Sequence, residues 1–253
     1  MERNIIYLDT VDSTNSYLKR LAKNGAKEGT IVLAKEQTQG KGRKGRSFQS
    51  EQNMGIYMSV LWKPQCELSQ LSEVTAWVAV AVARAIEGVT KVSPGIKWVN
   101  DLILNHKKVS GILTESSIDC ATGKIQYLII GIGVNVHNKE SDFSEEVGKI
   151  ATSLECVTGK TISKEILQKA IIAELEILYK QWPTGKREYL EGYRKRCITT
   201  GKDVIIERNG EKYEGKALEV TEDFRLKIKL KTGEEEIVSS GEVSVRGLNG
   251  YLS

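Results

Sequence analysis

The chain has 253 residues, of which 40% are hydrophobic and 28% charged, a composition typical of a folded, water-soluble protein of one or two domains. It is not the composition of a disordered chain. The net charge is +4, and the four cations Lys41, Arg43, Lys44 and Arg46 equal that whole excess. The positive charge is therefore a local feature, which argues against a broad basic face for nucleic acid.

The cellular compartment is indicated by the cysteines and by the start of the chain. The cysteines, Cys66, Cys120, Cys156 and Cys197, include no Cys-x-x-Cys pair, so we do not expect a structural zinc site. The first ten residues, MERNIIYLDT, lack the basic and apolar regions of a secretory signal. No apolar run approaches the ~20 residues that span a bilayer. We therefore expect a cytoplasmic protein with reduced thiols that has no membrane contact.

Apolar periodicity predicts alternating strands and helices in the first part of the chain. Strands are expected at Asn4–Leu8, Gly29–Gln37, Asn53–Trp62, Gly95–Asn105, Lys107–Ser116 and Lys124–Val136. One helix should be capped by Ser13 or Thr14 and stopped by Gly25, and others should span Leu68–Val89 and Ser163–Pro183. Turns at Asn105-His106 and Thr122-Gly123 join successive strands. The pattern predicts an α+β fold, with helices flanking a mixed, mostly antiparallel sheet.

The pattern changes near residue 201 to about five short strands. Turn signals at Asn209-Gly210 and Thr232-Gly233 lie between alternating runs, as in β-hairpins. We predict a small β-barrel. The expected division is a first domain over residues 1–185, a connector with a short helix over 186–200, and a barrel over 201–253.

The segment Gly40–Arg46, GKGRKGR, combines three glycines with four cations and contains no acid. So many glycines disfavour both a helix and an ordinary strand. Three interpretations remain open: a solvated surface loop, a nucleic-acid contact, and a phosphate cradle of backbone N–H groups and cations. The glycines also spell Gly-x-Gly-x-x-Gly, but a strand follows instead of the required helix, so we regard that match as chance.

Neighbouring motifs decide between these interpretations. In chain order they are Asp12-Ser13-Thr14-Asn15, Gln37 before the glycine loop, Lys97-Trp98-Val99-Asn100-Asp101, Lys108-Val109-Ser110-Gly111-Ile112-Leu113 and Gly131-Ile132-Gly133-Val134-Asn135. This series resembles the biotin protein ligases from about residue 5 onward. The final barrel resembles the SH3-like domain of that family. The resemblance implies a class II aminoacyl-tRNA synthetase/biotin ligase-like fold.

The resemblance also implies an activity. The expected enzyme is a biotin–[acetyl-CoA carboxylase] ligase that uses ATP and Mg²⁺ to form biotinyl-5′-AMP. It would transfer biotin to one lysine of the biotin carboxyl carrier protein. Members of the family are monomers or homodimers, and both states stay open for this chain. Bifunctional members carry an amino-terminal DNA-binding domain, for which the early position of Asp12 leaves no room, so DNA binding is not expected.

Site residues follow from the same resemblance. Biotin would be bound by Ser13, Thr14, Asn15, Gln37, Lys41, Gly42, Arg43, Lys97 and Lys108. ATP or the adenylate would be bound by Gly40, Lys41, Arg43, Arg46, Lys97, Lys108 and Asn135. The catalytic candidates are Arg43, Lys97 and Asp101, with Asp101 orienting or deprotonating the acceptor lysine. No set of metal ligands is predicted.

Each of these residues also has an ordinary structural alternative. Ser13 and Thr14 can cap a helix, Lys97 and Lys108 can be strand lysines facing solvent, Asp101 can stabilise a turn, and Asn135 can end a strand. The family's usual proline in the Lys-Trp-Pro-Asn-Asp motif is Val99 here, which leaves that turn less restricted. Two other functions stay open: a lipoate ligase or octanoyltransferase with the same catalytic fold, and a non-enzymatic nucleic-acid-binding module.

Overall fold

The computed structural model describes residues 4–208, 210–239 and 244–247. Its larger sheet has the strand order β1-β2-β3-β7-β6-β5-β4. The strands are β1 (Asn4–Val11), β2 (Thr30–Gln37), β3 (Gly55–Trp62), β4 (Gly95–Lys97), β5 (Asp101–Leu104), β6 (Lys107–Ile118) and β7 (Ile125–Asn135). Only β1 and β2 pair in parallel, whereas the other neighbours are antiparallel. The predicted mixed, mostly antiparallel sheet is therefore confirmed.

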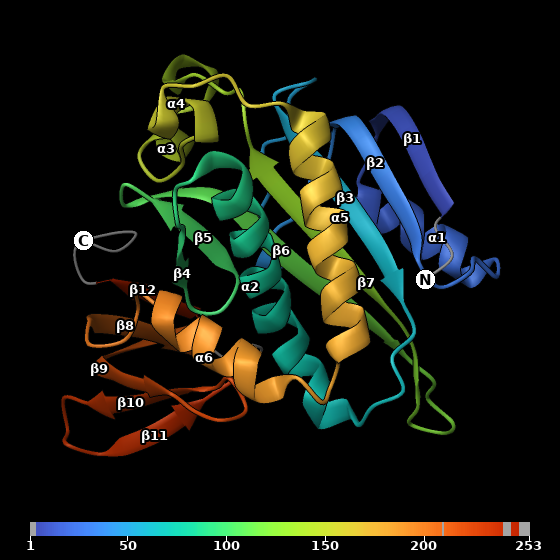
Figure 1. Ribbon diagram of the computed structural model, residues 1–253. Helices are drawn as coiled ribbons and strands as arrows, with labels where there is room; N and C mark the ends of the chain where they lie inside the picture. The colour runs from blue at the N-terminus through green and yellow to red at the C-terminus, as the bar shows by residue number, and fades with distance from the viewer. Residues whose placement is uncertain (1–3, 209, 240–243, 248–253) are drawn as a thin grey trace.

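Helices cover both faces of this sheet (Figure 1). On one face, α2 (Leu71–Thr90) and α5 (Lys164–Gln181) pack side by side on the sheet in the main apolar core. On the other face, α1 (Thr14–Lys23) packs through Leu18 and Ala22 onto Val32. Alternate residues of a strand point to opposite faces, so β2 contributes to both layers. The result is a three-layer α+β domain.

Two hairpin turns of the larger sheet lie at the positions predicted from the sequence. Asn105 and His106 have φ values of +47° and +62°, and they alone separate β5 from β6. Positive φ at both central residues matches the twist of the flanking strands. Gly123, with φ +69°, lies in the loop between β6 and β7. Both predicted turns are confirmed.

The prediction of one continuous strand over Gly95–Asn105 is wrong. Strand β4 ends at Lys97 and β5 begins at Asp101, so the chain folds back through residues 98–100. Trp98 is buried in this turn, where its backbone N–H donates to Oγ1 of Thr199 at 2.9 Å. The peptide bond between Trp98 and Val99 is cis. The sequence pattern does not distinguish this turn from a strand, because Trp98 and Val99 are as buried as residues of a strand interior.

The smaller sheet is antiparallel, with the order β11-β10-β9-β8-β12. Its strands are β8 (Asp203–Arg208), β9 (Glu211–Val220), β10 (Leu226–Leu230), β11 (Glu235–Val238) and β12 (Ser244–Gly247). The predicted Thr232-Gly233 turn is confirmed, with Gly233 at φ +95°. In the predicted Asn209-Gly210 turn, Asn209 lies outside the described residues. The expected short strands are therefore present.

The two sheets are joined by α6 (Lys186–Arg196) and by direct contacts. Nε1 of Trp98 donates to the carbonyl of Phe224 at 2.9 Å, and the Arg194 guanidinium donates to the carbonyl of Val220. The first contact fixes the carboxy-terminal part against the turn between β4 and β5, and the second fixes it against α6. The domain boundaries at residues 185 and 200 stay predictions.

The chain also has shorter helices. They are α3 (Glu145–Gly148), α4 (Leu154–Thr158) and the 3₁₀ turns η1 (Arg43–Gly45), η2 (Leu68–Gln70) and η3 (Glu140–Asp142). Of these, η2 lies at the start of the helix predicted over Leu68–Val89, η1 lies in the glycine segment where a helix was not expected, and the others lie in segments without a prediction. Helix α5 is capped as predicted, because the Ser163 side chain accepts from the Ile166 N–H at 3.3 Å. Among the described helices, none has the length and apolarity needed to span a bilayer.

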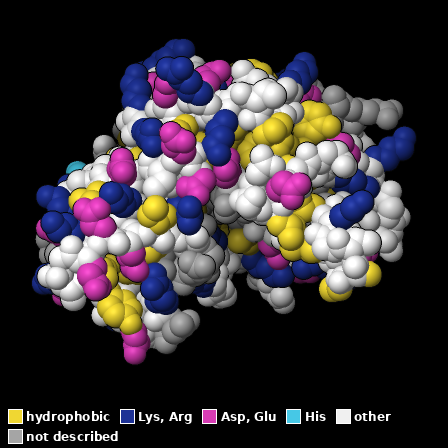
Figure 2. Space-filling view, turned by 90° about the horizontal axis from the view of Figure 1, so that it is seen from below, with side chains coloured by type: hydrophobic (Ala, Val, Ile, Leu, Met, Phe, Trp, Pro, Cys, Tyr) yellow, Lys and Arg dark blue, Asp and Glu magenta, His cyan; other side chains and the backbone are white. Residues whose placement is uncertain are grey.

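Four cations in the smaller sheet and its loops are paired with neighbouring carboxylates. The ion pairs are Arg208–Glu236, Arg225–Asp223, Lys227–Glu235 and Lys231–Glu214. On the face seen in Figure 2, basic and acidic side chains are interspersed over this part of the molecule. Such pairing supplies little of the unneutralised positive field that attracts a nucleic-acid backbone. The four cysteine thiols, all in the described part of the chain, are free of disulfides.

Candidate active site

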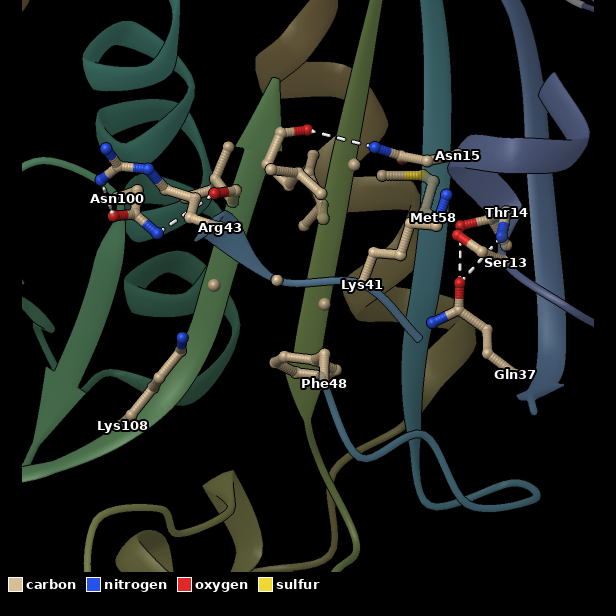
Figure 3. Close-up of a pocket in the computed structure, with 17 residues that line it drawn as sticks. Ser13, Thr14, Asn15, Gln37, Lys41, Arg43, Phe48, Met58, Asn100 and Lys108 are labelled. Atoms are coloured by element: carbon tan, nitrogen blue, oxygen red, sulfur yellow. Dashed lines mark hydrogen bonds between the residues drawn. The ribbon is translucent and has the colours of Figure 1, made fainter. Parts of the chain in front are cut away.

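One pocket gathers residues from segments far apart in the chain (Figure 3). Its lining consists of Ser13, Thr14, Asn15, Gln37, Lys41, Gly42, Arg43, Phe48, Met58, Asn100, Lys108, Gly111, Ile112, Leu113, Gly131, Ile132 and Gly133. Figure 3 shows Thr14, Asn15 and Gln37 at one end and Arg43 and Lys108 at the other. The pocket therefore has a neutral polar end and a cationic end.

The polar end is built where β1 passes into α1. Ser13, Thr14 and Asn15 are each at most 3% exposed. Gln37, at the end of β2, accepts through Oε1 from the backbone N–H of Thr14 at 2.8 Å and from its hydroxyl at 3.0 Å. The Ser13 side chain makes no capping hydrogen bond, so helix capping is not what holds it here. These side chains form a preorganised set of hydrogen-bonding groups.

The glycine segment folds into a short hairpin beside the pocket. Lys41 and Ser47 form an antiparallel bridge, and the Gly42 N–H donates to the carbonyl of Arg46 at 2.7 Å. A Cβ on Gly40 would lie 2.2 Å from the carbonyl oxygen of Phe48, so only glycine permits this close approach. The hairpin carries Lys41, Gly42 and Arg43 into the lining.

Arg43 is anchored at the cationic end. Its Nη1 donates to Oδ1 of Asn100 at 2.8 Å. Burial lowers the pKa of the Arg43 guanidinium, and the nearby Asp101 carboxylate raises it in opposition. An arginine keeps its charge under such shifts because its ordinary pKa is above 12. The result is a fixed, partly desolvated positive charge at the pocket.

Lys108 enters the same end of the pocket from β6. Its Nζ lies 2.7 Å from Oδ1 of Asp101 and 5.8 Å from the centroid of the Phe48 ring. A Cβ on Gly111 would be 2.8 Å from this nitrogen, so the glycine leaves room for the ammonium group. The solvent-facing alternative for Lys108 is wrong, because its side chain is 23% exposed and ion-paired.

The other predicted site residues lie outside the lining. Lys97 ends β4 opposite Asp101 and is 7% exposed. The solvent-facing alternative is therefore wrong for Lys97 as well. Asp101 reaches the site through its ion pair with Lys108. Asn135 is buried, and its Nδ2 donates to the carbonyl of Thr152 at 3.0 Å. Gly40 shapes the hairpin, and Arg46 is exposed on it. Their predicted roles toward ATP, biotin and the acceptor lysine stay predictions.

No residue cluster indicates a protein-held metal. Within residues 4–208, 210–239 and 244–247, no group of three or more His, Cys, Asp or Glu side chains could hold a metal ion. Mg²⁺ is commonly bound through one or two carboxylates and the phosphates of a nucleotide.

Comparison with known sequences matches both parts of the chain. Residues 7–135 match the biotin/lipoate A/B protein ligase family, and residues 199–246 match the biotin protein ligase C-terminal domain. The chain belongs to the biotin/lipoate A/B protein ligase family. Since it also carries the C-terminal domain of biotin protein ligases, the predicted resemblance and the predicted ligase class are confirmed.

Curated members of this ligase family align with nearly the whole chain. The bifunctional ligase/repressor BirA of Bacillus spizizenii is 33% identical over 95% of this chain and 74% of its own length. The biotin–[acetyl-CoA-carboxylase] ligase of Mycobacterium tuberculosis is 28% identical over 91% of this chain and 85% of its own.

Solved structures of the ligase family agree with the fold. The biotin protein ligase of Aquifex aeolicus in complex with biotin and ATP superposes with a TM-score of 0.82 at 30% identity, covering 97% of this chain and 100% of that one. The Leishmania major ligase in complex with biotin gives 0.66 at 26% identity, over 95% and 100%. The predicted fold class, including the SH3-like final domain, is confirmed.

Several lining residues had not been assigned from the sequence. They are Phe48, Met58, Asn100, Gly111, Ile112, Leu113, Gly131, Ile132 and Gly133. Most belong to the motifs of this ligase family, but an apolar residue or a glycine in a strand resembles ordinary core. Gly131 is an example of a functional glycine that was missed. A Cβ there would lie 2.3 Å from Oδ1 of Asn15, so the glycine is what allows the Asn15 side chain to approach β7.

Proposed function

We propose that this protein is an ATP-dependent biotin protein ligase that activates biotin as biotinyl-5′-AMP. It then transfers the biotinyl group to one lysine of the biotin carboxyl carrier protein of acetyl-CoA carboxylase. The observation that carries the proposal is the two-ended pocket, with the hydrogen-bonding set of Thr14, Asn15 and Gln37 facing the cations Arg43 and Lys108. A ligand with a polar ring, an apolar chain and a carboxylate has the matching order of groups.

The cationic end suits the first half-reaction. The biotin carboxylate attacks the α-phosphate of ATP, the mixed anhydride forms, and pyrophosphate leaves. Charge accumulates on phosphoryl oxygens in this step, and preorganised cations and N–H groups stabilise it. Arg43 and the Lys108 ammonium supply such charge, and Lys41 lies beside them in the lining. Mg²⁺, bound to the ATP phosphates, would neutralise further charge on the triphosphate.

The second half-reaction requires a neutral acceptor lysine. Its amine attacks the carbonyl of the mixed anhydride, an amide bond forms, and AMP leaves. Asp101 is the proposed partner of that amine, since its carboxylate borders the cationic end through Lys108 at 2.7 Å. Water would destroy the anhydride, so a loop folded over the site protects it. The glycine hairpin, held to Asn100 by Arg43, is suited to that purpose.

Two observations weigh against the other functions. A lipoate ligase shares the catalytic family, but the match of residues 199–246 is to the C-terminal domain of biotin protein ligases. For a nucleic-acid-binding module, the cations of the smaller sheet would have to be available to phosphates, whereas four of them are ion-paired.

Mass spectrometry of a carrier domain tests the proposal. The protein is incubated with ATP, Mg²⁺, the carrier, and biotin or lipoate, with release of AMP and pyrophosphate measured in parallel. We expect a biotin-sized mass gain on one carrier lysine that depends on ATP. A mass gain with lipoate alone would favour the lipoate ligase, and no gain with either would contradict the proposed function.

A further inference from the structure

Ser59 lies beneath the polar end of the pocket, on β3, where it is fully buried. Its hydroxyl oxygen is 2.7 Å from Oγ1 of Thr14 and 2.6 Å from Oδ1 of Asn15. Both neighbours line the pocket, whereas Ser59 does not. Its hydroxyl therefore controls how two ligand-facing groups use their hydrogen-bonding capacity.

The orientation of the Asn15 amide is fixed from the far side. Its Nδ2 lies 2.8 Å from Oε2 of Glu115, and an ionised carboxylate can only accept hydrogen bonds. The NH₂ group of Asn15 must therefore face Glu115. Oδ1 of Asn15 then faces Ser59, pressed against Gly131, and it can only accept.

The orientation of the Gln37 amide is fixed from the glycine hairpin. The Ser50 hydroxyl donates to the carbonyl of Phe48 at 2.9 Å, so its oxygen accepts from Nε2 of Gln37 at 2.8 Å. Oε1 of Gln37 must then face Thr14, where it accepts from the backbone N–H and from the hydroxyl.

The hydrogens between these two fixed acceptors can be counted. Three oxygen–oxygen contacts join Gln37 to Thr14, Thr14 to Ser59, and Ser59 to Asn15. Each contact needs one hydrogen, and the hydroxyls of Thr14 and Ser59 supply one each. One of the three contacts therefore always lacks a hydrogen. A buried contact between lone pairs is unfavourable.

We propose that Ser59 is a specificity-determining positioning residue that makes this pocket select a ligand with an N–H donor. The inference rests on the proposed function, in which the ring of the ligand is the cyclic urea of biotin. A ligand N–H placed between Oε1 of Gln37 and Oγ1 of Thr14, two residues that line the pocket, supplies the missing hydrogen and leaves the Thr14 hydroxyl to donate to Ser59. The Ser59 hydroxyl then donates to Asn15, and each of the three contacts holds a hydrogen. A dithiolane ring, which has no N–H, leaves the deficit in place.

Calorimetric titration of the full chain with biotin and two analogues tests this inference. In each analogue one N–H of the cyclic urea is replaced by oxygen, which gives a cyclic carbamate of nearly the same shape. We expect at least one carbamate to bind the wild type roughly tenfold or more weakly than biotin, since a site built for an N–H rejects a ligand without it.

Ser59→Ala removes one hydrogen and two of the contacts, so the Thr14–Gln37 contact is satisfied without a ligand N–H. Biotin should bind more weakly, because Asn15 loses a partner, and the preference for biotin over the carbamate should shrink to within about threefold. Ser59→Cys, which keeps a weak donor of similar shape, should give an intermediate preference. The matched control is Ser117→Ala, since Ser117 lies on β6 and bonds Gln126 outside this network.

Equal binding of biotin and both carbamates by the wild type would overturn the inference and leave the proposed function intact. Retention of the full preference in Ser59→Ala would also overturn it. Failure to bind biotin or either carbamate would instead overturn the proposed function, and the inference with it. The wild-type comparison needs no variant, so the test does not depend on how Ser59→Ala folds.

Discussion

The guanidinium of Arg43 donates from Nη1 to Oδ1 of Asn100 at 2.8 Å and so ties the glycine hairpin to the turn between β4 and β5. Asn100 is itself held, because its Nδ2 donates to Oδ1 of Asp101 at 2.9 Å and to the carbonyl of Ile112 at 3.2 Å. The contact therefore links the hairpin to the residues that flank the cationic end of the pocket.

Asn100→Ala should release this end of the hairpin without removing a charge. A hydrogen bond to a charged group contributes about 1.5–3 kcal/mol, so the hairpin should open roughly tenfold more often. The activated intermediate would then escape and acylate nearby amines. We expect more biotin on a bystander such as serum albumin, compared at equal adenylation rates, with Arg43→Gly giving a larger increase.

Lys44→Ala is the matched control for this experiment. It removes a cation from the same hairpin, but Lys44 is exposed and lies outside the pocket lining. Albumin labelling by this variant should match the wild type. If Asn100→Ala forms adenylate and labels albumin no more than the wild type does, Asn100 does not retain the hairpin.

Gly111→Ala should impair adenylation while preserving the fold. The new Cβ would lie 2.8 Å from Nζ of Lys108, and the end of a lysine side chain moves at little cost in free energy. The displaced ammonium group would lose the position proposed for it at the reacting phosphate, with an expected loss of about tenfold or more in single-turnover pyrophosphate release. The control is Gly88→Ala in α2, where a Cβ meets nothing within 4 Å. An unchanged rate in Gly111→Ala would show that the Lys108 position does not matter.

The polar end of the pocket was predictable because its residues are consecutive or stand in a recognisable order. Ser13, Thr14 and Asn15 form one motif, and Gln37 precedes the glycine segment. The contact between Arg43 and Asn100 joins residues 57 positions apart, and nothing local in the sequence encodes it. Ser59 sits among apolar neighbours in a fully buried strand, where a small polar residue is easily taken for core.

The fold shows the same division between local and long-range information. Strands, turns and the capped helix α5 were predicted from periodicity and from turn residues. The break between β4 and β5 was not, because it depends on Trp98 packing against Phe224 and Thr199 of the carboxy-terminal part. Turns made by tertiary contacts leave no periodicity to detect.

Lys97→Met separates two possible contributions of this lysine. Methionine keeps a long apolar stem in a position that is 7% exposed, but it removes the charge. If the ammonium group acts on the reacting carboxylate and phosphate, single-turnover pyrophosphate release should fall about 10²–10³-fold, as expected for loss of one such donor. The urea midpoint, measured on the same samples, should change less than for Lys97→Ala. Release within about threefold of the wild type would exclude a catalytic role for Lys97.

The ion pair between Asp12 and Arg20 makes stability depend on pH. Arg20 donates to both carboxylate oxygens, at 2.8 and 3.0 Å, and this hydrogen bonding lowers the pKa of Asp12 to about 2 from an ordinary 3.8. A carboxyl group whose pKa is lower in the folded state stabilises the fold when it is ionised. That stabilisation is complete above about pH 4 and is lost as the pH falls toward 2.

Arg20→Gln should therefore lower the urea midpoint at pH 7, and its difference from the wild type should shrink between pH 4 and pH 2. The difference should be modest and should fall with added salt, since the Arg20 and Asp12 side chains are 56% and 37% exposed. Lys23→Gln removes the same charge from the last turn of α1, where a cation interacts with the helix dipole and not with Asp12. Its effect should persist through that acid range. If the Arg20→Gln difference stayed constant from pH 7 to pH 2, Asp12 would not be the group that Arg20 stabilises.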